Sequence, residues 1–395
     1  MAFRIGAIAL LSAILLAGCT ASVGSPSTAD PAASQPRPMP EPEDPVQQYA
    51  DDRLSVMTLD EKIRSMLMIH LPGLDAAHLG SIAKAEGVGG LILMGDNVPE
   101  PAETLATLTP LLSAERGLPV LVAIDQEGGV VRRIGLDGAP AAAELRHADP
   151  AAAHDAFAWR AGLLASLGVS VNFGVVADVS ADPASFIFER SFGGDPASAS
   201  ARVAAAVSGE HGTVLSTLKH FPGHGVSAAD SHVDIPTTAI GIDEWRTVHA
   251  PSFAAGITAG AEFVMMGHLQ FDAIDPQPAS LSAGWIDVLR TDLGFDGIVI
   301  TDDLGMLTAS GRADLADPAT NAVRAVAAGN TMLLFVGPVD VASIVVAIRT
   351  AVLDGRIDES MIDDAAHRIL VLRRTLSGET GRFVHCFDEC LAMIE

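Results

Sequence analysis

The sequence predicts a single α/β domain with the architecture of a (β/α)8 TIM-type barrel. Eight short apolar runs have the length of buried strands, and segments of helical length rich in Ala or Leu separate most of them. Strands that alternate with helices form parallel sheets, and eight such repeats close one barrel. An open doubly wound sheet is the alternative. The phosphate-binding pattern G-x-G-x-x-G is absent after the early runs, which removes the usual dinucleotide interpretation.

The first residues resemble the signal peptide of a bacterial lipoprotein. Arg4 precedes an apolar stretch, residues 5–16, that is too short to span a membrane as a mature helix, and Leu16-Ala17-Gly18-Cys19 closes it. This ending resembles a lipobox, which implies removal of residues 1–18 and attachment of lipid to the sulfur of Cys19. We therefore expect an extracytoplasmic protein that contacts the cell membrane through its lipid anchor only. An ordinary secretory signal with a chance cysteine is the alternative.

Both ends of the mature chain are predicted to lie outside the folded domain. Residues 19–45 are rich in Ala, Ser, Pro and Asp and predict a disordered tether, which would reach roughly 80 Å if fully extended. Residues 377–395 form a C-terminal tail in which Cys386 and Cys390 can form a small disulfide in an oxidising compartment. His385 is the one further ligand beside them, which is too few for a zinc site, and we expect no metal.

The barrel domain is predicted to span residues 46–376. Its first helix starts near residue 54, where Thr58 and Asp60 have the character of N-terminal caps. The eight apolar runs are residues 66–69, 90–94, 120–124, 169–176, 214–218, 263–266, 298–300 and 332–336. Helices are predicted at residues 103–114, 151–167, 199–211, 243–258, 319–328, 341–353 and 360–376. These elements complete one barrel and leave no room for a second domain.

The composition limits the classes of partner. The chain has 24 basic and 49 acidic residues, which gives a formal net charge of −25. Such a field repels nucleic acid and an acidic membrane surface, so a neutral or cationic small ligand is easier to accommodate. We expect the barrel to act as a monomer.

Polar residues follow several of the apolar runs, and in a barrel the loops after the strands share one rim. In chain order they are Asp125-Gln126-Glu127-Gly128-Gly129 with Arg132 and Arg133, then Asp178 and Glu189-Arg190, then a long loop from Lys219, then Gly267-His268, and finally Asp302-Asp303. A pocket of carboxylates, arginines and histidines without a nucleophilic cysteine favours sugar chemistry.

The richest of these loops begins directly after the run 214–218. It reads Lys219-His220-Phe221-Pro222-Gly223-His224-Gly225 and continues to Asp230-Ser231-His232. Pro222 and the flanking glycines forbid a regular helix, so we expect a loop that presents these side chains without burying them. A zinc hydrolase using His220, His224 and His232 is excluded, because ligands spaced i, i+4 need a helix.

Several motifs together resemble the β-N-acetylglucosaminidases of glycoside hydrolase family 3. They are DQEGG, RSFGGDP, KHFPGHG followed by DSH, LGFDGIV and TDDLGM, and the resemblance covers residues 54–376. It implies a retaining exo-enzyme without a cofactor, which removes terminal N-acetylglucosamine from glycans such as peptidoglycan fragments. It also implies that Asp302 is the nucleophile, that His232 is the general acid/base and that Asp230 orients His232.

The same resemblance implies which residues bind the sugar. The family positions that hold the N-acetylglucosamine ring are Asp125, Arg133, Arg190, Lys219 and His220. This chain departs from the family at three other positions. The family usually has Arg where Val130 stands, Ser where Thr301 stands and Asp where Asn330 stands. These departures leave room for a different preference in the part of the substrate beyond the cleaved sugar.

The residues themselves support this chemistry up to a point. Retaining cleavage needs a carboxylate that attacks the anomeric carbon and a proton donor beside the leaving oxygen. A histidine donor becomes neutral when it gives up its proton, so it avoids a second anion beside the nucleophile. The residues do not decide between Asp302 and Asp303, because adjacent residues on a strand face opposite ways and both faces here are apolar.

Two other functions stay open. A phosphorylase would use the same site and pass the sugar to phosphate instead of water, because a neutral histidine lessens the repulsion of an anionic acceptor. A solute-binding lipoprotein would share the lipid anchor and the α/β pattern, but it needs two lobes and a hinge, for which the sequence gives no sign.

Overall fold

The computed structural model describes residues 44–384 except residues 228, 230, 232 and 233. The predicted signal peptide, Cys19, residues 19–43 of the tether, Cys386 and Cys390 lie outside the described residues. So do Asp230 and His232. Within the described part of the chain, no helix is long and apolar enough to cross a membrane.

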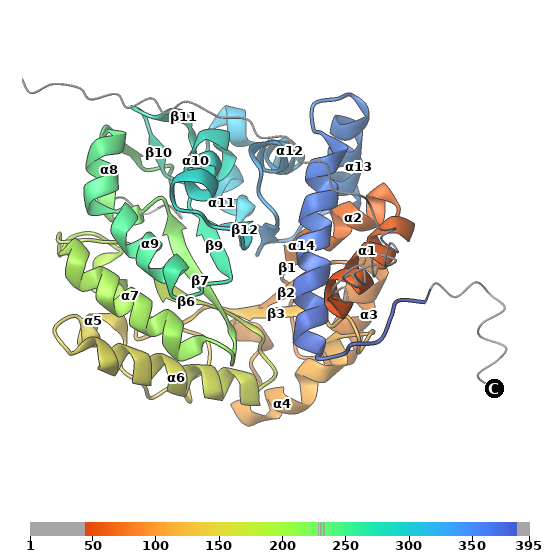
Figure 1. Ribbon diagram of the computed structural model, residues 1–395, viewed down its shortest axis with the longest axis horizontal. Coiled ribbons are helices and arrows are strands. Elements are labelled where there is room, and N and C mark those ends of the chain that lie inside the picture. The colour runs from red at the N-terminus through yellow and green to blue at the C-terminus, as the bar shows by residue number, and fades with distance from the viewer. Residues whose placement is uncertain (1–43, 228, 230, 232–233, 385–395) are drawn as a thin grey trace, which may run out of the picture. The chain divides into compact units, whose positions relative to one another are not determined.

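Eight parallel strands form a barrel, and each coincides with one of the predicted apolar runs (Figure 1). They are β1 (Leu67–Ile69), β2 (Gly90–Leu93), β3 (Leu121–Ile124), β6 (Val171–Val176), β7 (Leu215–Phe221), β9 (Phe263–Met266), β12 (Ile298–Thr301) and β13 (Leu333–Phe335). They follow one another around the barrel in this order, and β13 pairs with β1. The ring closes where Ile300 of β12 forms a parallel bridge with Met332. The predicted barrel is confirmed.

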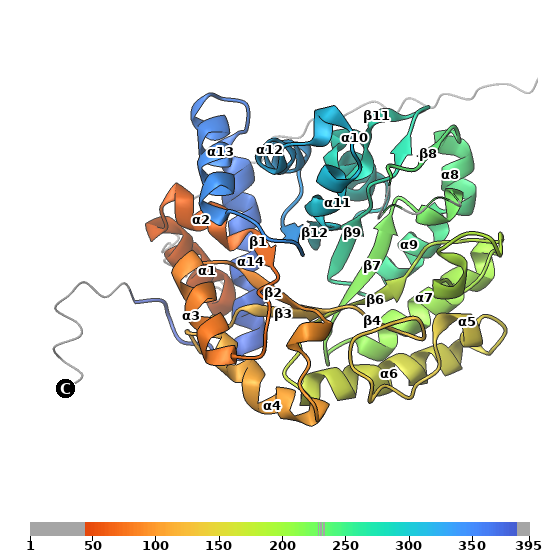
Figure 2. The same ribbon diagram turned by 180° about the vertical axis from the view of Figure 1, so that it is seen from behind.

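Helices surround the strands, as the two opposite views show (Figures 1 and 2). They are α1 (Pro45–Val56), α2 (Leu59–Ser65), α3 (Ala76–Glu86), α4 (Leu105–Leu108), α5 (Ala142–Leu145), α6 (Pro150–Ser166), α7 (Pro196–Glu210), α8 (Ile242–Val248), α9 (Ala250–Thr258), α10 (Ala283–Asp287), α11 (Leu304–Ala309), α12 (Pro318–Ala328), α13 (Val341–Leu353) and α14 (Glu359–Ser377). Thr58 caps α2 through a reciprocal pair of hydrogen bonds with Glu61, as the sequence predicted.

Two predicted helices are interrupted. The segment 103–114 forms only the short helix α4 between two 3-10 turns, because Pro110 cannot continue an α-helix. The segment 243–258 is divided into α8 and α9 at His249, and Pro251 lies in the first turn of α9. Where a proline follows an Asp cap, in contrast, it starts a helix. This pattern begins α1, α6, α7 and α12 at Asp44-Pro45, Asp149-Pro150, Asp195-Pro196 and Asp317-Pro318.

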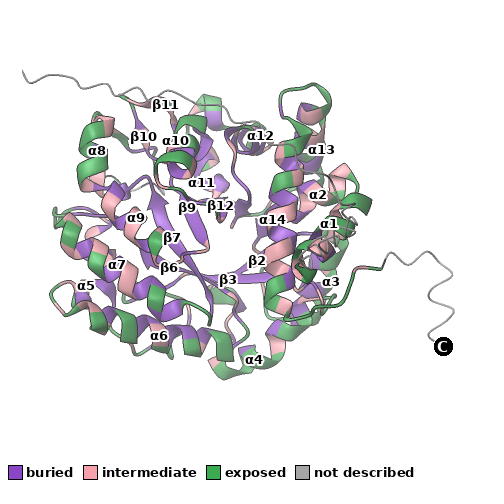
Figure 3. Ribbon diagram, in the orientation of Figure 1, coloured by how far each residue is buried: buried purple, intermediate pink, exposed green. Residues whose placement is uncertain are grey.

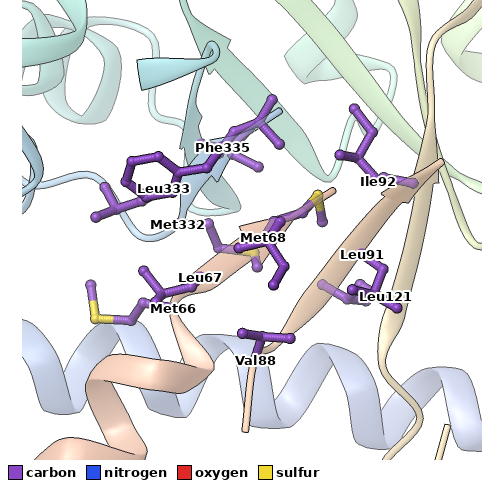
Figure 4. Close-up of a cluster of buried hydrophobic side chains, with 14 of the residues drawn as sticks. Met66, Leu67, Met68, Val88, Leu91, Ile92, Leu121, Met332, Leu333 and Phe335 are labelled. Atoms are coloured by element: carbon purple, nitrogen blue, oxygen red, sulfur yellow. The ribbon is translucent and has the colours of Figure 1, made fainter. Parts of the chain in front are cut away.

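Burial is concentrated on the strands and on the helix faces that contact them, while the outer helix faces are exposed (Figure 3). One apolar cluster surrounds β1, β2 and β13 and includes Met68, Leu91 and Phe335 (Figure 4). A second cluster lies behind the end of β7, where the Phe221 ring contacts Trp245 and Phe253, among others. Trp245 Nε1 donates to the carbonyl of Pro222 at 2.7 Å, so this aromatic cluster braces the segment that follows β7.

Strand β7 continues further than the sequence predicted. The expected loop at Lys219 starts only after Phe221, and Lys219 and His220 are buried members of the strand. The expectation that these side chains stay unburied is therefore wrong. Lys219 pairs with Val176 of β6, and its carbonyl accepts a hydrogen bond from Ala177 N at 2.8 Å. A buried lysine is tolerated here because carboxylates replace its hydration, as described next.

Candidate active site

The charged residues that the sequence placed after successive strands meet at the carboxyl ends of those strands. Asp125 directly follows β3 and begins the segment that returns as a small antiparallel hairpin of β4 (Gln126–Gly128) and β5 (Val131–Arg132). Gly128 and Gly129 adopt φ angles of 86° and 63° in the turn, a region that favours glycine. The hairpin thereby directs both Asp125 and Arg133 toward the end of β7.

Lys219 lies at the centre of a network of ion pairs. Its Nζ atom donates to Asp125 Oδ1 at 2.9 Å and lies 2.7 Å from Glu127 Oε1. Arg190 binds the two carboxylate oxygens of Glu127 at 3.0 and 2.7 Å, and Arg133 Nη2 donates to Asp125 Oδ2 at 3.3 Å. Cations and anions therefore alternate from one neighbour to the next. The structure brings together four of the five proposed sugar-binding residues through these direct contacts.

The alternation of cations and anions determines the pKa values of Glu127, Lys219 and Arg190. Burial acts to raise the pKa of Glu127, but Lys219 and Arg190 outweigh it and hold that pKa at about 2. Burial acts to lower the pKa of Lys219, but Asp125 and Glu127 raise it above the usual value. The pKa of Arg190 is also raised, because its pairing with Glu127 outweighs burial. Glu127, Lys219 and Arg190 thus stay ionised at neutral pH and present a fixed array of donors and acceptors.

His220, the fifth proposed sugar-binding residue, joins this network through Arg190. Its Nε2 atom lies 3.3 Å from Arg190 Nη2, and its Nδ1 atom lies 2.8 Å from Asp178 Oδ2. Asp178 follows β6, and its side chain is fully buried. The ring of His220 is therefore held between a carboxylate and a guanidinium.

Asp302 and Asp303 differ in their surroundings. Asp303 Oδ1 accepts hydrogen bonds from the backbone N–H groups of Gly305 and Val336 at 2.9 and 3.0 Å, so this carboxylate caps α11 and fastens the chain after β13. Asp302 follows β12, and its Oδ1 atom accepts a hydrogen bond from the backbone N–H of Asp303 at 2.8 Å. Burial acts to raise its pKa, but the imidazoles of His220 and His268, together with Asp303 N–H and Lys219, outweigh it and lower the pKa.

The pKa of Asp303 shifts in the opposite direction. Burial raises its pKa, and although the two N–H groups that it caps act against this, the pKa stays above the usual value. Of the two aspartates, Asp303 is the helix cap, and Asp302 is the one whose pKa is lowered. The structure thus distinguishes two residues that the residue pattern could not.

The comparison with family models decides what kind of protein this is. The model described as the glycosyl hydrolase family 3 N terminal domain matches residues 58–372. The chain belongs to glycoside hydrolase family 3. The resemblance inferred from the motifs is confirmed at the level of the family, and the protein is a glycosidase.

Individual members of family 3 are similar over most of the barrel. The β-hexosaminidase of Xylella fastidiosa (strain M23) is 37% identical over 237 residues, which cover 57% of this chain and 70% of that protein. The solved family 3 β-N-acetylglucosaminidase from Paenibacillus sp. str. FPU-7 is 31% identical with a TM-score of 0.75, and the match covers 84% of this chain and 65% of that one. The β-N-acetylhexosaminidase from Beutenbergia cavernae DSM 12333 is 30% identical with a TM-score of 0.71, covering 80% of this chain and 98% of that one.

The three departures from the family pattern lie outside the ion-pair network. Val130 is 68% exposed at the hairpin turn. Thr301 is buried, and its hydroxyl accepts a hydrogen bond from Leu334 N at 3.1 Å across the closing seam of the barrel. Asn330 Nδ2 donates to two carbonyls, those of Ser280 and Ala325, at 2.9 and 2.8 Å. An ionised Asp could not make these two bonds, because a carboxylate only accepts.

Sequence reasoning gave no role to Glu127 or Asp178, although it noted both. Glu127 stands two residues after Asp125 within DQEGG, and its role as the shared partner of Lys219 and Arg190 depends on contacts between distant parts of the chain. The bidentate partner of Arg190 is Glu127.

His268 has a structural place. Its Nε2 atom lies 2.8 Å from the carbonyl of Asp303, and its Nδ1 atom lies 2.7 Å from the hydroxyl of Ser280. Since a carbonyl only accepts, Nε2 carries the proton and Nδ1 accepts from the hydroxyl. Among the described residues, no group of three or more His, Cys, Asp or Glu side chains is arranged to hold a metal ion.

Proposed function

We propose that this protein is a retaining exo-β-N-acetylglucosaminidase that hydrolyses terminal, non-reducing N-acetylglucosamine from glycans such as peptidoglycan fragments. Membership of family 3 and similarity to proteins named β-hexosaminidase and β-N-acetylglucosaminidase support the reaction class. The observation that carries the proposal is the buried network of Lys219, Glu127 and Arg190 at the carboxyl ends of the strands, in the same barrel as Asp302, which directly follows β12.

In the first step, a carboxylate oxygen of Asp302 attacks the anomeric carbon, the glycosidic bond breaks, and the leaving oxygen takes a proton from His232. In the second step, His232 takes a proton from water, the water oxygen bonds to the anomeric carbon, and the bond to Asp302 breaks. Asp230 orients His232 throughout. The roles of Asp230 and His232 rest on the resemblance of the motif, since both residues lie outside the described part of the chain.

The proposed sugar contacts follow from the chemistry of the network. Lys219, Arg133 and Arg190 carry only donors, and they match the hydroxyl oxygens and acetamido carbonyl of the sugar. Asp125 accepts from hydroxyl groups. Because these side chains are already paired with one another, binding sugar costs little further ordering, and the neutral substrate suits a strongly acidic protein.

We further propose that the mature enzyme acts outside the cytoplasm as a monomer, anchored to the cell membrane through lipid on Cys19. The tether would let the barrel reach glycan at a distance from the bilayer. Membrane fractions of cells that produce the wild type should hold the enzyme, and the Cys19→Ala variant should appear in the soluble fraction. An unchanged membrane association of that variant would contradict the anchor.

The reaction is tested by comparing a chromogenic β-N-acetylglucosaminide with the matching β-glucoside. The acetamido contacts predict a strong preference for the first substrate, and equal rates on both would overturn the substrate assignment. Repeating the reaction with phosphate distinguishes the acceptor. A free sugar product supports hydrolysis, whereas N-acetylglucosamine 1-phosphate as the main product would show that the enzyme is a phosphorylase.

A further inference from the structure

Asp178 ties together both ends of the segment from His220 to His224. The backbone N–H of His220 donates to its carboxylate at 3.2 Å, and the backbone N–H of His224 donates to Oδ1 at 2.5 Å. The same carboxylate receives Nδ1 of the His220 ring at 2.8 Å. One buried side chain at the end of β6 therefore fixes the backbone of the neighbouring strand and the orientation of an imidazole in the pocket.

These contacts determine which nitrogen of His220 carries the proton. A carboxylate only accepts hydrogen bonds, so Nδ1 must be the donor toward Asp178. On the other side of the ring, Nε2 lies 3.3 Å from Arg190 Nη2, which has only donors. A proton on Nε2 would point at another donor, so Nε2 is the acceptor. The neighbours on both sides favour the same tautomer.

Charged groups of both signs surround the ring, with the Asp178 carboxylate at Nδ1 and the Arg190 guanidinium at Nε2. Arg190 is fixed in place by its two bonds to Glu127, so its Nη2 donor stays directed at Nε2. The imidazole of His224 lies edge-on, with the ring centroids 5.9 Å apart, and burial lowers the pKa of His224 to about 4, so this ring is neutral at pH 7. The other charged or titratable groups that act on the pocket beside His220 are Asp302, His268 and Lys219.

We propose that Asp178 is a positioning residue that holds His220 as the Nδ1–H tautomer, so that Nε2 accepts from Arg190 Nη2 and helps to hold that guanidinium in place. In the substrate complex, Arg190 would donate to the sugar through its remaining N–H groups. The statement about the substrate rests on the proposed function, but the statement about the tautomer does not. Asp178 acts through His220 and need not touch the substrate.

The Asp178→Asn variant tests this assignment, because it keeps the shape and removes one acceptor. Either orientation of the amide places its NH2 group against a donor, which is His220 Nδ1–H or His224 N–H. The ring can relieve the first conflict by moving its proton to Nε2. We expect kcat/KM on the chromogenic β-N-acetylglucosaminide to fall on the order of 10- to 100-fold, mainly through KM, because a proton on Nε2 removes the bond that helps to hold Arg190, a proposed sugar contact, in place.

The tautomer is measured directly by two-bond ¹H–¹⁵N correlation on histidine-labelled protein, with the His220→Gln variant used to assign the signal. Wild type should show a protonated Nδ1 and an unprotonated Nε2, and Asp178→Asn should show the proton on Nε2 or exchange between the two nitrogens. A wild-type ring with the proton on Nε2, or protonated at both nitrogens at pH 7, would overturn the proposal even if the variant failed to fold.

His249→Leu is the matched control. The His249 side chain packs against Gly223 in the same turn, is buried, and makes no hydrogen bond through Nδ1 in the described structure. This variant disturbs packing behind the turn and leaves the Asp178 carboxylate in place, so the His220 tautomer should stay as in wild type. If His249→Leu moved the tautomer as much as Asp178→Asn, the effect would belong to the turn rather than to the carboxylate. Failure of wild type to hydrolyse any β-N-acetylglucosaminide would remove the proposed function and leave the tautomer result intact.

Discussion

The two sides of the barrel mouth hold their charged residues in different ways. On the side of β3 and β7, side chains hold side chains, and Lys219 and Arg190 share the carboxylate of Glu127. On the side of β12, backbone amides of two other segments hold Asp303, while the adjacent Asp302 accepts the backbone N–H of Asp303. Charges in the first region depend on one another, whereas two neighbouring carboxylates in the second can take separate roles.

The largest expected effect separates the two aspartates. Asp302→Ala should lose turnover on the order of 10⁴-fold or more, since it removes the attacking atom. Asp303→Ala should keep measurably more activity and instead lose about 1 kcal/mol of stability, the usual cost of deleting a helix cap. Steady-state kinetics and urea denaturation of both variants check this. A reversal of the two activities would mean that the roles of the two residues are exchanged.

The Glu127→Gln variant tests whether the charged residues on the side of β3 and β7 depend on one another. Lys219 and Glu127 are 2% and 4% exposed, and removing one partner of a buried pair costs about 3–5 kcal/mol. The matched control is Glu115→Gln, which breaks the Arg53 pair at 3.2 Å whose side chains are 29% and 45% exposed. That control should cost less than about 1 kcal/mol. Equal losses of unfolding free energy in the two variants, measured by urea denaturation, would contradict the expectation that the buried pair contributes more than the exposed pair.

Two buried glutamates should respond to pH with opposite signs. The pKa of Glu127 is lowered to about 2, so its contribution to stability is present above the unfolded value of 4.5 and is lost as the pH falls toward 2. Burial raises the pKa of Glu210 to about 7, although Ser216 and Asn172 each donate to it at 2.6 Å. Its contribution is present below pH 4.5 and is lost as the pH rises through 7.

Glu210→Gln isolates the second of these effects, because the amide keeps the shape and removes the titration. Measured against wild type by urea denaturation, this variant should gain in relative stability between pH 5 and pH 8. The stability of Glu127→Gln should come closer to that of wild type as the pH falls from 4.5 toward 2, because wild type then loses the contribution of its Glu127 carboxylate. If the difference in stability between each variant and wild type did not change with pH across these ranges, neither carboxyl group would titrate as its surroundings indicate.

The smallest effect is expected at the exposed end of the hairpin. Val130→Arg restores the usual family residue at a position that is 68% exposed, so stability should change by less than about 0.5 kcal/mol. The variant should alter KM for extended glycans more than for a nitrophenyl glycoside if residue 130 contacts sugar beyond the cleaved unit. Identical KM changes for both substrates would remove residue 130 from any role in extended-glycan recognition.

The parts of the fold that depend on local pattern could be predicted from the sequence. All eight apolar runs became strands, because a fully buried parallel strand needs only a short continuous apolar segment. The extension of β7 through His220 could not be predicted, because it requires burial of a lysine. The carboxylates that permit this burial, Asp125 and Glu127, come from another strand and its hairpin. A short sequence window contains no sign of such partners.

The candidate site shows the same limit. The types of residue and their places after the strands predicted a sugar pocket, and the motifs identified the family. The residues alone could not separate Asp302 from Asp303, since that difference lies in two backbone amides, one of them at Val336 on the next strand's loop. The role of Asp178 could not be predicted either, because its hydrogen-bond partners belong to the neighbouring strand and turn.

The most direct test of the account is to trap the glycosyl-enzyme. A fluorinated N-acetylglucosamine analogue with a good leaving group should form the intermediate and slow its hydrolysis, and mass spectrometry of the digested protein locates the label. The account predicts one sugar per chain, attached to Asp302. A label on Asp303, or turnover without any covalent label, would contradict the assignment of Asp302 as the nucleophile.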